Sequence, residues 1–274
     1  MKVTLITVCF NSAATLSTAI DSVLSQKGVD VEYIVVDGGS KDGTVEVVEE
    51  FSRKERKDRK EGFEFKWISE KDSGMYDAIN KGIKMATGDV VGILNADDVL
   101  ASDDTLAHIV SAFNTDSCAL TPDPSRVDAV YADIRFVREG ETVESVRNAE
   151  TVRYCSAKRW RPWMFRFAAM VPHPSFYVRR ECFEKLGGYS LDYRICADFE
   201  LELRYLYLAK LRAAYLPECV VVMRMGGMST SGWRSNLVIN REDLRALRAH
   251  GIWSCMPLIY LKYLFKVWGF ILRR

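Results

Sequence analysis

Two adjacent carboxylates are the clearest candidates for chemistry in this sequence. Asp97 and Asp98 directly follow the apolar segment 90–94, which is typical of a buried strand. Two like charges there are costly unless a cation offsets them, and Mg²⁺ prefers one or two carboxylates together with phosphate oxygens and water. The pair therefore predicts a divalent metal site for a phosphate-containing ligand. The alternative is a helix cap, which we prefer for Asp103 and Asp104 because a helix is expected to begin there.

A third carboxylate, Asp37, follows the expected buried strand at residues 31–36 and opens the sequence DGGSKDGT. Its glycines fit a turn with positive φ angles, although turns of this composition are common. The chain contains neither GxGxxG nor GxxxxGKS/T, so neither a dinucleotide fingerprint nor a P-loop is indicated. A lone carboxylate at a strand end can instead accept a hydrogen bond from the imide N–H of a base such as uracil.

Segments with strand character alternate with segments of helical periodicity along the first half of the chain. Strands are expected at residues 3–10, 31–36, 65–69, 90–94 and 127–134, and helices at 13–26, 43–51, 75–86 and 104–113. This alternation predicts an α/β fold with a doubly wound, parallel sheet. Ligands gather at the carboxyl ends of such strands. Residues 7–11, Asp37, Asp72 and residues 95–98 are therefore expected to meet at one edge.

The composition is that of an ordinary globular protein of 274 residues, with 48% hydrophobic and 27% charged residues. Lysine and arginine total 38 against 37 acidic residues, and this balance argues against nucleic-acid binding. The seven cysteines form no CxxC pair and no zinc-ligand pattern, so we interpret them as reduced thiols. The N-terminal segment lacks the apolar region and cleavage site of a signal peptide. We expect a cytoplasmic protein.

The rest of the chain is less regular. Residues 53–61 hold six basic and three acidic residues and are interpreted as a solvated loop. Residues 139–141 are interpreted as a hairpin turn. The second half contains no repeat or obvious linker, and we expect it to pack onto the sheet.

The C-terminal segment is basic and apolar. After Asp243 it holds six lysines or arginines and no acidic residue. Residues 252–272 are too interrupted by polar residues for a membrane-spanning helix. Lys262, Lys266 and Arg273 share one helical face, which suits an interfacial helix on an anionic membrane. The alternative is a terminal helix packed on the protein or on a second subunit.

Several stretches together resemble the family 2 glycosyltransferases, which have the GT-A fold. The resemblance rests on ITVCFN at 6–11, VVDGGSKDGT at 35–44, SEKDSGMYDAINKG at 69–82, ATGD at 86–89, LNADD at 94–98, HPSFYVRR at 173–180, GGY at 187–189 and ADFE at 197–200. It covers roughly residues 3–230. It implies a Rossmann-like, mostly parallel sheet flanked by helices, with a nucleotide-binding half at 1–135, an acceptor-side half at 136–230 and a C-terminal amphipathic helical segment at 231–274. The sequence DSGMYD at 72–77 resembles the branch that builds bacterial O-antigen and capsule polysaccharides.

The resemblance also implies roles for the acidic residues of the first half. Asp37 and Asp72 would bind the nucleotide base and ribose, and Thr7 would line the base pocket. Asp97 would hold the ribose or share the metal, and Asp98 would be the principal metal ligand to the diphosphate.

In the second half, Asp198 matches the catalytic base of the family. It would begin a helix over residues 198–208, where the helix dipole favours its ionised form, while Asp192 and Glu200 are alternative bases. His173 could contact acceptor or diphosphate, or be a structural loop residue. Arg224, in the sequence RMGGMST, could meet phosphate or be a surface arginine.

The resemblance implies an inverting transfer of a sugar from a nucleoside diphosphate sugar, with a UDP-sugar favoured, to a glycan or lipid-linked acceptor in cell-surface polysaccharide synthesis. The cofactor would be Mg²⁺ or Mn²⁺. The family often has aspartate where this chain has Asn95, so contact of Asn95 with the metal stays open. Alternatives are a sugar nucleotidyltransferase, which the absence of a glycine-rich pyrophosphorylase loop disfavours, and a non-catalytic nucleotide-sugar-binding relative. Peripheral contact with the inner face of the membrane is the expected location.

Overall fold

The protein is described by a computed structural model that covers residues 1–58, 60–114, 126–138, 140–226 and 232–263. Within these residues nine strands form one sheet: β1 (Lys2–Cys9), β2 (Asp30–Asp37), β3 (Phe63–Ser69), β4 (Val90–Ile93), β5 (Val99–Leu100), β6 (Ala129–Val137), β7 (Arg153–Cys155), β8 (Tyr177–Arg179) and β9 (Ala213–Arg224). The strand order is β3-β2-β1-β4-β8-β6-β9-β5, with β7 paired to β6. The four neighbouring strands β3, β2, β1 and β4 are parallel to one another. Beyond β4 the sheet contains both parallel and antiparallel pairs. The predicted α/β fold is confirmed.

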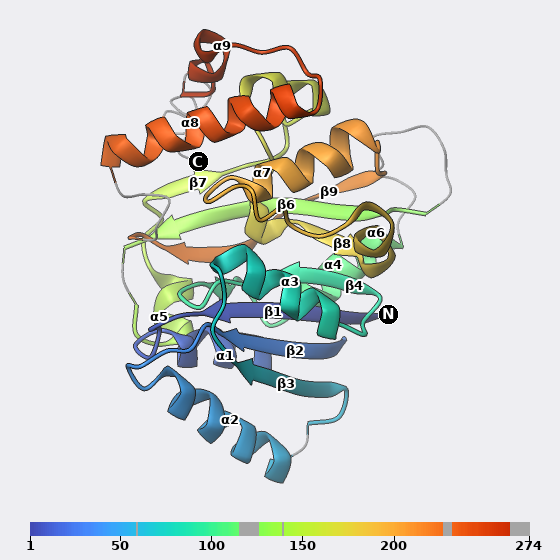
Figure 1. Cartoon of the computed structure of the whole chain (residues 1–274). Helices are drawn as coiled ribbons and strands as arrows, with labels where there is room; N and C mark the ends of the chain where they lie inside the picture. Colours follow the sequence, from blue (N-terminus) through green and yellow to red (C-terminus); the bar gives the residue numbers. More distant parts are fainter. Residues whose placement is uncertain (59, 115–125, 139, 227–231, 264–274) are drawn as a thin grey trace.

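Helices cover both faces of the sheet (Figure 1). One face packs against α1 (Leu16–Leu24), α2 (Thr44–Asp58) and α4 (Thr105–Phe113). The other packs against α3 (Met75–Met85), α6 (Arg180–Leu186), α7 (Ala197–Glu202), α8 (Gly232–Ala249) and α9 (Met256–Tyr260). Strands β1, β2 and β4 lie between these two cores and are mostly buried and apolar, as parallel strands covered on both faces require. The edge strand β3 is only partly buried.

The buried carboxylate of Glu32 ties the amino-terminal ends of the parallel strands together. Its Oε1 atom accepts hydrogen bonds from Lys66 Nζ at 2.5 Å and Thr87 Oγ1 at 2.7 Å. Its Oε2 atom accepts from Thr4 Oγ1 at 2.5 Å and from the Thr87 amide at 2.7 Å. Burial alone would raise the pKa of Glu32, but these hydrogen bonds outweigh it and bring the pKa to about 2. One side chain on β2 thus links β1, β3 and the turn before β4.

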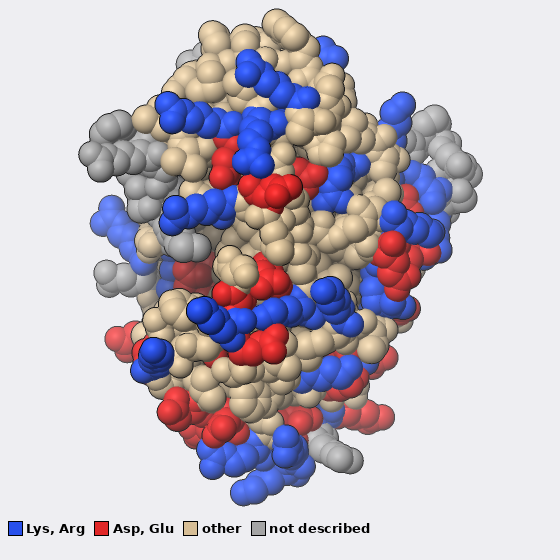
Figure 2. All heavy atoms as spheres, viewed as in Figure 1, with Lys and Arg blue, Asp and Glu red and all other residues tan. Residues whose placement is uncertain are grey.

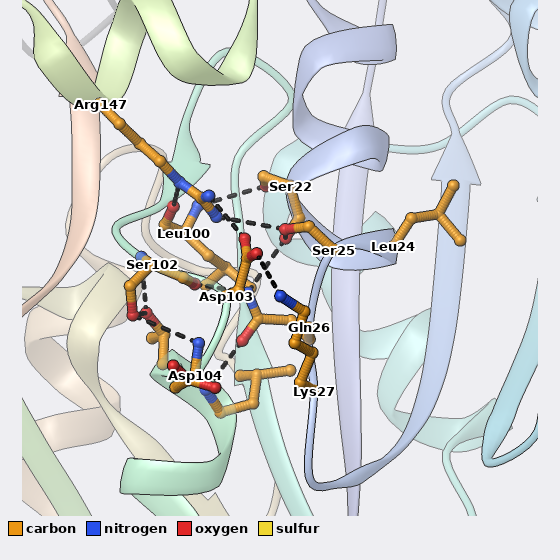
Figure 3. Close-up of polar contacts among 12 residues, drawn as sticks. Ser22, Leu24, Ser25, Gln26, Lys27, Leu100, Ser102, Asp103, Asp104 and Arg147 are labelled. Atoms are coloured by element: carbon orange, nitrogen blue, oxygen red, sulfur yellow. Dashed lines mark hydrogen bonds and ion pairs between the residues drawn. The ribbon is translucent and has the colours of Figure 1, made fainter.

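A second polar cluster holds the segment that follows Asp98 (Figure 3). Arg147, on α5 (Val143–Asn148), donates from Nε to the Leu100 carbonyl at 2.9 Å and from Nη1 to Asp103 Oδ1 at 2.7 Å. Asp103 also pairs with Lys27 at 3.1 Å, and the bond to Arg147 is the main cause of its lowered pKa. The expected helix cap is wrong for Asp103, since its carboxylate binds cations from α5 and from the segment after α1. Asp104 occupies the N-cap position of α4 without a side-chain cap bond.

Two interpretations of the irregular segments are wrong. Residues 53–58 continue α2 rather than forming a loop, because their lysines, arginines and glutamates are good helix formers and solvent receives the charged face. The connection between the antiparallel strands β6 and β7 holds α5, begun by a capping box of Thr142 and Ser145, and is not a tight hairpin.

The C-terminal prediction also changes where the structure describes it. Within the predicted apolar segment, α9 covers Met256–Tyr260. Lys262 is only 5% exposed and pairs with buried Asp243 at 2.7 Å, so its assignment to a solvated or membrane-facing helical surface is wrong. Lys266 and Arg273 lie outside the described residues. In the part of the chain that the structure covers, no helix combines the length and the apolar character needed to cross a membrane.

The Glu32 cluster yields a stability prediction. Glu32→Gln should lower the free energy of unfolding by about 2 to 4 kcal/mol at pH 7, because a buried set of donors loses its carboxylate. The folded pKa of Glu32 lies below the ordinary value, so its contribution is present above about pH 4.5 and is lost as pH falls toward 2. The difference between wild type and variant should therefore shrink in urea unfolding at pH 3.

Glu64→Gln is the matched control. Glu64 is paired with Glu32 in the β2–β3 register and shares Lys66, but its side chain is 45% exposed. Glu64→Gln should lower the free energy of unfolding by less than about 1 kcal/mol. Equal losses for the two variants would contradict the role of Glu32.

Candidate active site

The parallel register brings the predicted polar segments to one edge of the sheet. Cys9 on β1 pairs with Asp37 at the end of β2, and Asp37 pairs with Ser69 at the end of β3. On the other side of β1, Ile6 pairs with Ile93 at the end of β4, two residues before Asn95. Each strand thus delivers its polar extension at the same edge, as the alternation of strands and helices predicts.

Asp37 is buried and held by its own loop. Its Oδ2 atom accepts hydrogen bonds from the Gly39 and Ser40 amides at 3.0 Å each and from Ser69 Oγ at 2.7 Å, and its Oδ1 atom accepts from Ser40 Oγ. Burial would raise the pKa of Asp37, but these donors lower it overall. The carboxylate is therefore ionised at neutral pH and fixed in orientation.

Asp72 lies against this loop. A Cβ atom at Gly38 would be 2.5 Å from Asp72 Oδ2, so glycine is what allows the two segments to approach. Asp72 Oδ1 accepts a hydrogen bond from the Gly74 amide at 2.9 Å. The structure thus brings Asp37 and Asp72 together at the ends of β2 and β3.

Asp98 is fully buried, and one of its oxygens lacks a partner. Asn95 Nδ2 donates to Asp98 Oδ2 at 2.7 Å, whereas Asp98 Oδ1 has no hydrogen-bond partner among the described residues. Burial, followed by the neighbouring charge of Asp97, raises the pKa of Asp98 well above its ordinary value. Burial also raises the pKa of the partly buried Asp97. Asn95 thus orients the Asp98 carboxylate through this hydrogen bond.

This pair of carboxylates fits a hard divalent cation. A cation beside Asp98 Oδ1 would satisfy a buried acceptor and offset two repelling charges. Among the residues that the structure covers, no cluster of three or more His, Cys, Asp or Glu side chains could hold a metal. The protein would therefore supply Asp98 and Asp97, and a ligand's phosphate oxygens and water would supply the rest, as Mg²⁺ and Mn²⁺ sites allow.

Arg224, at the end of β9, is bound to backbone carbonyls beside this pair. Its Nη1 atom donates to the Asp97 carbonyl at 2.7 Å, and its Nε and Nη2 atoms donate to the Gly140 carbonyl at 3.0 and 2.8 Å. Its charge lowers the pKa of both Asp97 and Asp98 without offsetting their burial. Arg224 is therefore no surface arginine. The part of its loop at residues 227–231 lies outside the described residues.

Asp198 is the second residue of α7 and contacts an aromatic residue of α3. Its Oδ1 atom accepts a hydrogen bond from the Phe199 amide at 2.8 Å and lies 3.2 Å from the hydroxyl oxygen of Tyr76, which also bonds to the Ile195 carbonyl. Burial raises the pKa of Asp198 to about 6 and so outweighs both hydrogen bonds. The expected preference for the ionised form at a helix start is thus weaker than burial. A carboxylate with this pKa is suited to general-base chemistry near neutral pH.

Tyr189 connects this carboxylate to His173. Its ring stacks on Tyr76 with centroids 5.6 Å apart, and its hydroxyl lies 2.7 Å from His173 Nε2. Asn80 holds the Tyr189 backbone, donating to its carbonyl at 2.8 Å and accepting from its amide at 2.9 Å. Burial lowers the pKa of His173 to about 4, so this histidine is neutral at pH 7 and cannot serve as a cation for a diphosphate.

The two acidic neighbours of Asp198 on the helix differ sharply. Glu200 is buried, and its Oε1 atom bonds to Arg204 Nε at 2.7 Å and His250 Nε2 at 2.8 Å. Glu202 is also buried, but among the described residues only its Oε2 atom has a partner, the Val171 amide at 3.1 Å. Burial, then the charge of Asp198, raises the pKa of Glu202 well above its ordinary value. Glu200 is engaged in an ion pair, and Asp192, the other alternative base, is exposed to solvent.

The backbone before Asp198 is fixed by a residue of α8. The carboxylate of Glu242 accepts hydrogen bonds from the backbone amides of Arg194, Ile195 and Cys196 at 3.1, 2.9 and 3.0 Å.

Thr7, on β1, lies in the core: it is fully buried, and its Oγ1 atom accepts a hydrogen bond from Tyr33 at 3.0 Å. Its register partner on β2 is Val35, two residues before Asp37.

Comparison with known proteins decides the family. The model for glycosyl transferase family 2 matches residues 4–187. The chain belongs to glycosyl transferase family 2. This establishes a glycosyltransferase and confirms the family resemblance of the sequence.

Relatives in the family agree. The PGL/p-HBAD biosynthesis glycosyltransferase of Mycobacterium bovis (strain BCG / Pasteur 1173P2) is 30% identical over 237 residues, which are 86% of this chain and 80% of that protein. An uncharacterized glycosyltransferase of Mycobacterium tuberculosis is 32% identical over 203 residues, covering 74% and 68%. These names do not include the O-antigen or capsule role that the sequence predicted.

Solved structures confirm the fold. Staphylococcus aureus TarS 1-349 has a TM-score of 0.61 at 17% identity, covering 90% of this chain and 65% of that one. The mannosyltransferase PcManGT from Pyrobaculum calidifontis, in complex with GDP-Man and Mn²⁺, also has a TM-score of 0.61, at 23% identity, covering 89% and 64%. This chain thus spans just under two thirds of either structure.

Several residues that shape the site of this family 2 enzyme were not singled out from the sequence. Tyr76 and Asn80 lie inside the segment at 69–82, and Tyr189 lies in GGY, so their signal was the segments themselves. Glu202 and Glu242 follow no short pattern, because their importance comes from burial and from contacts across the fold.

The contrast between Glu202 and Glu200 yields a prediction. The folded pKa of Glu202 is raised, so the stability that its neutral form allows is present below about pH 4.5 and declines as pH rises. Glu202→Gln removes that dependence and should raise the melting temperature at pH 8 by roughly 2 °C or more relative to wild type, with a smaller gain at pH 5. Differential scanning fluorimetry at both pH values measures this.

Glu200→Gln is the control, since it removes a paired carboxylate from the same helix. It should lower the melting temperature at pH 8. A destabilised Glu202→Gln protein at pH 8 would show that Glu202 is ionised and bonded.

Proposed function

We propose that this family 2 enzyme is an inverting glycosyltransferase that uses a nucleoside diphosphate sugar, with Asp198 as the catalytic base. The observation that carries the proposal is the position of Asp198, whose half-buried carboxyl group has a pKa of about 6 and contacts Tyr76 on α3. Because α3 begins just after Asp72, the same segment reaches from the clustered carboxylates at the sheet edge to the base.

The donor would bind at the edge formed by β1 to β4. Asp37 and Asp72 would supply fixed acceptors for the N–H of the base and for the ribose hydroxyls, and Thr7 would line the base pocket. Asp97 and Asp98 would hold Mg²⁺ or Mn²⁺ against the diphosphate, and the bound cation would offset charge on the leaving group. Arg224 and His173 border this region as polar neighbours of the diphosphate and acceptor.

The reaction needs one proton transfer and one displacement. The acceptor hydroxyl gives its proton to Asp198 as its oxygen forms a bond to the anomeric carbon, and the bond from that carbon to the diphosphate oxygen breaks. The nucleoside diphosphate leaves with the bonding electron pair. One displacement inverts the anomeric configuration, and the enzyme forms no covalent intermediate.

The substrate proposal goes further than the family. TarS has been solved with UDP-GlcNAc and PcManGT with GDP-Man, so related folds accept both nucleotides. We favour a UDP-sugar and a glycan or lipid-linked acceptor in cell-surface polysaccharide synthesis, including O-antigen, at the cytoplasmic face of the membrane. Family membership gives no support to a sugar nucleotidyltransferase, and a non-catalytic relative would not need Asp98 and Asp198 together.

Donor turnover tests the proposal. Asp98→Asn and Asp198→Asn should each reduce release of nucleoside diphosphate by at least about 100-fold in a panel of UDP- and GDP-sugars with Mn²⁺ and an acceptor. Asp98→Asn should also weaken Mn²⁺-dependent donor binding in calorimetry, whereas Asp198→Asn should leave it near wild type.

Exposed acids six residues from each tested aspartate in the sequence are the matched controls. Asp104→Asn, at the start of α4, and Asp192→Asn, before α7, should keep turnover within about twofold of wild type. Unchanged turnover in Asp198→Asn, or a large loss in Asp192→Asn, would move the base elsewhere. Absence of turnover with every donor would favour a binding protein.

The pH dependence of kcat/KM should distinguish the roles of the two stacked tyrosines, Tyr76 and Tyr189. Activity should fall as pH drops through about 6, because Asp198 must be ionised to act as a base. The hydrogen bond from Tyr76 lowers the pKa of Asp198, so Tyr76→Phe should move the acid limb of kcat/KM upward by about 0.5 to 1 pH unit. Tyr189→Phe should leave that limb in place, since its hydroxyl contacts His173. Equal profiles for both variants would exclude Asp198 as the titrating group.

A further inference from the structure

Two segments far apart in the sequence lack acidic residues. Residues 151–180 contain seven lysines or arginines and no aspartate or glutamate, and residues 244–263 contain three and none. The chain as a whole is nearly balanced, with 38 basic and 37 acidic residues. Local depletion of acids over two separate stretches is therefore a feature of these stretches and not of the composition.

The fold packs these two segments together. The first contains the 3₁₀ helix η2 (Pro162–Phe167), and the second contains the turn between α8 and α9. Ser254 Oγ donates to the Arg166 carbonyl at 2.7 Å, which fixes the turn against η2. In Figure 1 both lie at the end of the molecule that carries α8 and α9, away from α2, and Figure 2 shows uncharged side chains over α9 and basic side chains over the neighbouring α8.

Large aromatic side chains point into solvent from both segments. Trp253 is 72% exposed and Trp163 is 55% exposed. Trp160, three residues before Trp163, is buried and donates to the Ala169 carbonyl. The same short region thus keeps one tryptophan in the core and presents another outward, so the exposure of Trp163 is not a general failure of the region to bury its aromatic residues.

The segment that carries Trp163 also presents exposed basic side chains. Lys158, Arg159 and Arg166 are all exposed. Trp163 and Arg166 are three residues apart in η2, so they lie on the same side of a 3₁₀ helix. We call Lys158, Arg159, Trp163, Arg166 and Trp253 the Trp–Arg surface.

We propose that the Trp–Arg surface binds an anionic lipid bilayer. Tryptophan partitions to the headgroup level of membranes, where its ring is buried and its N–H stays hydrated. Lysine and arginine near an anionic leaflet each add attraction, and no acidic residue of either segment opposes it. Lys262, which the sequence assigned to a membrane-facing helix, is buried on Asp243 and takes no part.

The inference extends the proposed function, in which a lipid-linked acceptor would be met at the membrane, but it rests on separate residues. None of the five belongs to the candidate active site. Vesicle binding and nucleoside diphosphate release are measured separately, so either proposal can fail alone.

Co-sedimentation of the full chain with phosphatidylcholine vesicles, with and without phosphatidylglycerol, tests the proposal. Wild type should bind the phosphatidylglycerol vesicles at least about tenfold more tightly than the neutral ones, and added salt should weaken that binding. The variant Trp163→Ser/Trp253→Ser should lose at least about tenfold in affinity. The triple change of Lys158, Arg159 and Arg166 to glutamine should lose on the order of 100-fold.

Matched controls use the distant helix α2 and an exposed aromatic residue elsewhere. Changing Arg53, Arg56 and Lys57 to glutamine alters the net charge equally, and Phe10→Ser removes a side chain that is 63% exposed. Both should bind vesicles like wild type and, like the test variants, keep the wild-type melting temperature.

Three outcomes would overturn the proposal. One is no preference of wild type for phosphatidylglycerol vesicles. Another is an equal loss of binding in the α2 control, which would reduce the effect to net charge. The third is full binding by Trp163→Ser/Trp253→Ser together with equally salt-sensitive binding to RNA, which would assign the surface to polyanions in general.

Discussion

The burial of carboxylates is the constraint on which the rest of this structure depends. A buried carboxylate needs donors or cations, and the protein meets that need differently at the two ends of its parallel strands. At the amino-terminal ends, Glu32 receives Lys66 and a set of hydroxyl and amide donors and becomes a fully satisfied structural hub. At the carboxyl ends, Asp98 has one oxygen without a hydrogen-bond partner in the part of the chain that the structure describes. The carboxylate at the amino-terminal ends of the strands is thus fully hydrogen-bonded, whereas the one at their carboxyl ends can still accept a cation or a donor.

Three aspartates of the candidate site differ in their pKa values. Asp37 is held by its own loop and stays ionised, Asp98 is destabilised as an anion, and Asp198 lies between these extremes with a pKa near 6. Such differences separate the tasks of similar side chains, because a fixed acceptor, a cation ligand and a proton acceptor need different ionisation behaviour. Burial is the largest influence on all three, and the number of local donors decides the outcome.

The sequence could predict what depends on periodicity and on strand ends. The alternation of strands and helices predicts that Asp37, Asp72 and Asp98 share an edge, because parallel strands have no other place to deliver them. It could not predict that Tyr76 meets Asp198, since these residues are 122 positions apart and their contact depends on how the second half docks. Lys262 shows the same limit, because helical periodicity describes a face but not whether an acidic partner such as Asp243 covers it.

The contacts of Glu242 have a consequence for engineering this enzyme. The family match ends at residue 187, whereas Asp198 and the glutamate that fixes its loop both come later in the chain. The loop before Asp198 is held by Glu242 of α8, so the segment 188–202 does not contain all the contacts that fix its own backbone. A chimaera that exchanges the Asp198 region between relatives must therefore transfer α7 and α8 as one unit, with its junction before Gly187 and its end after Ala249.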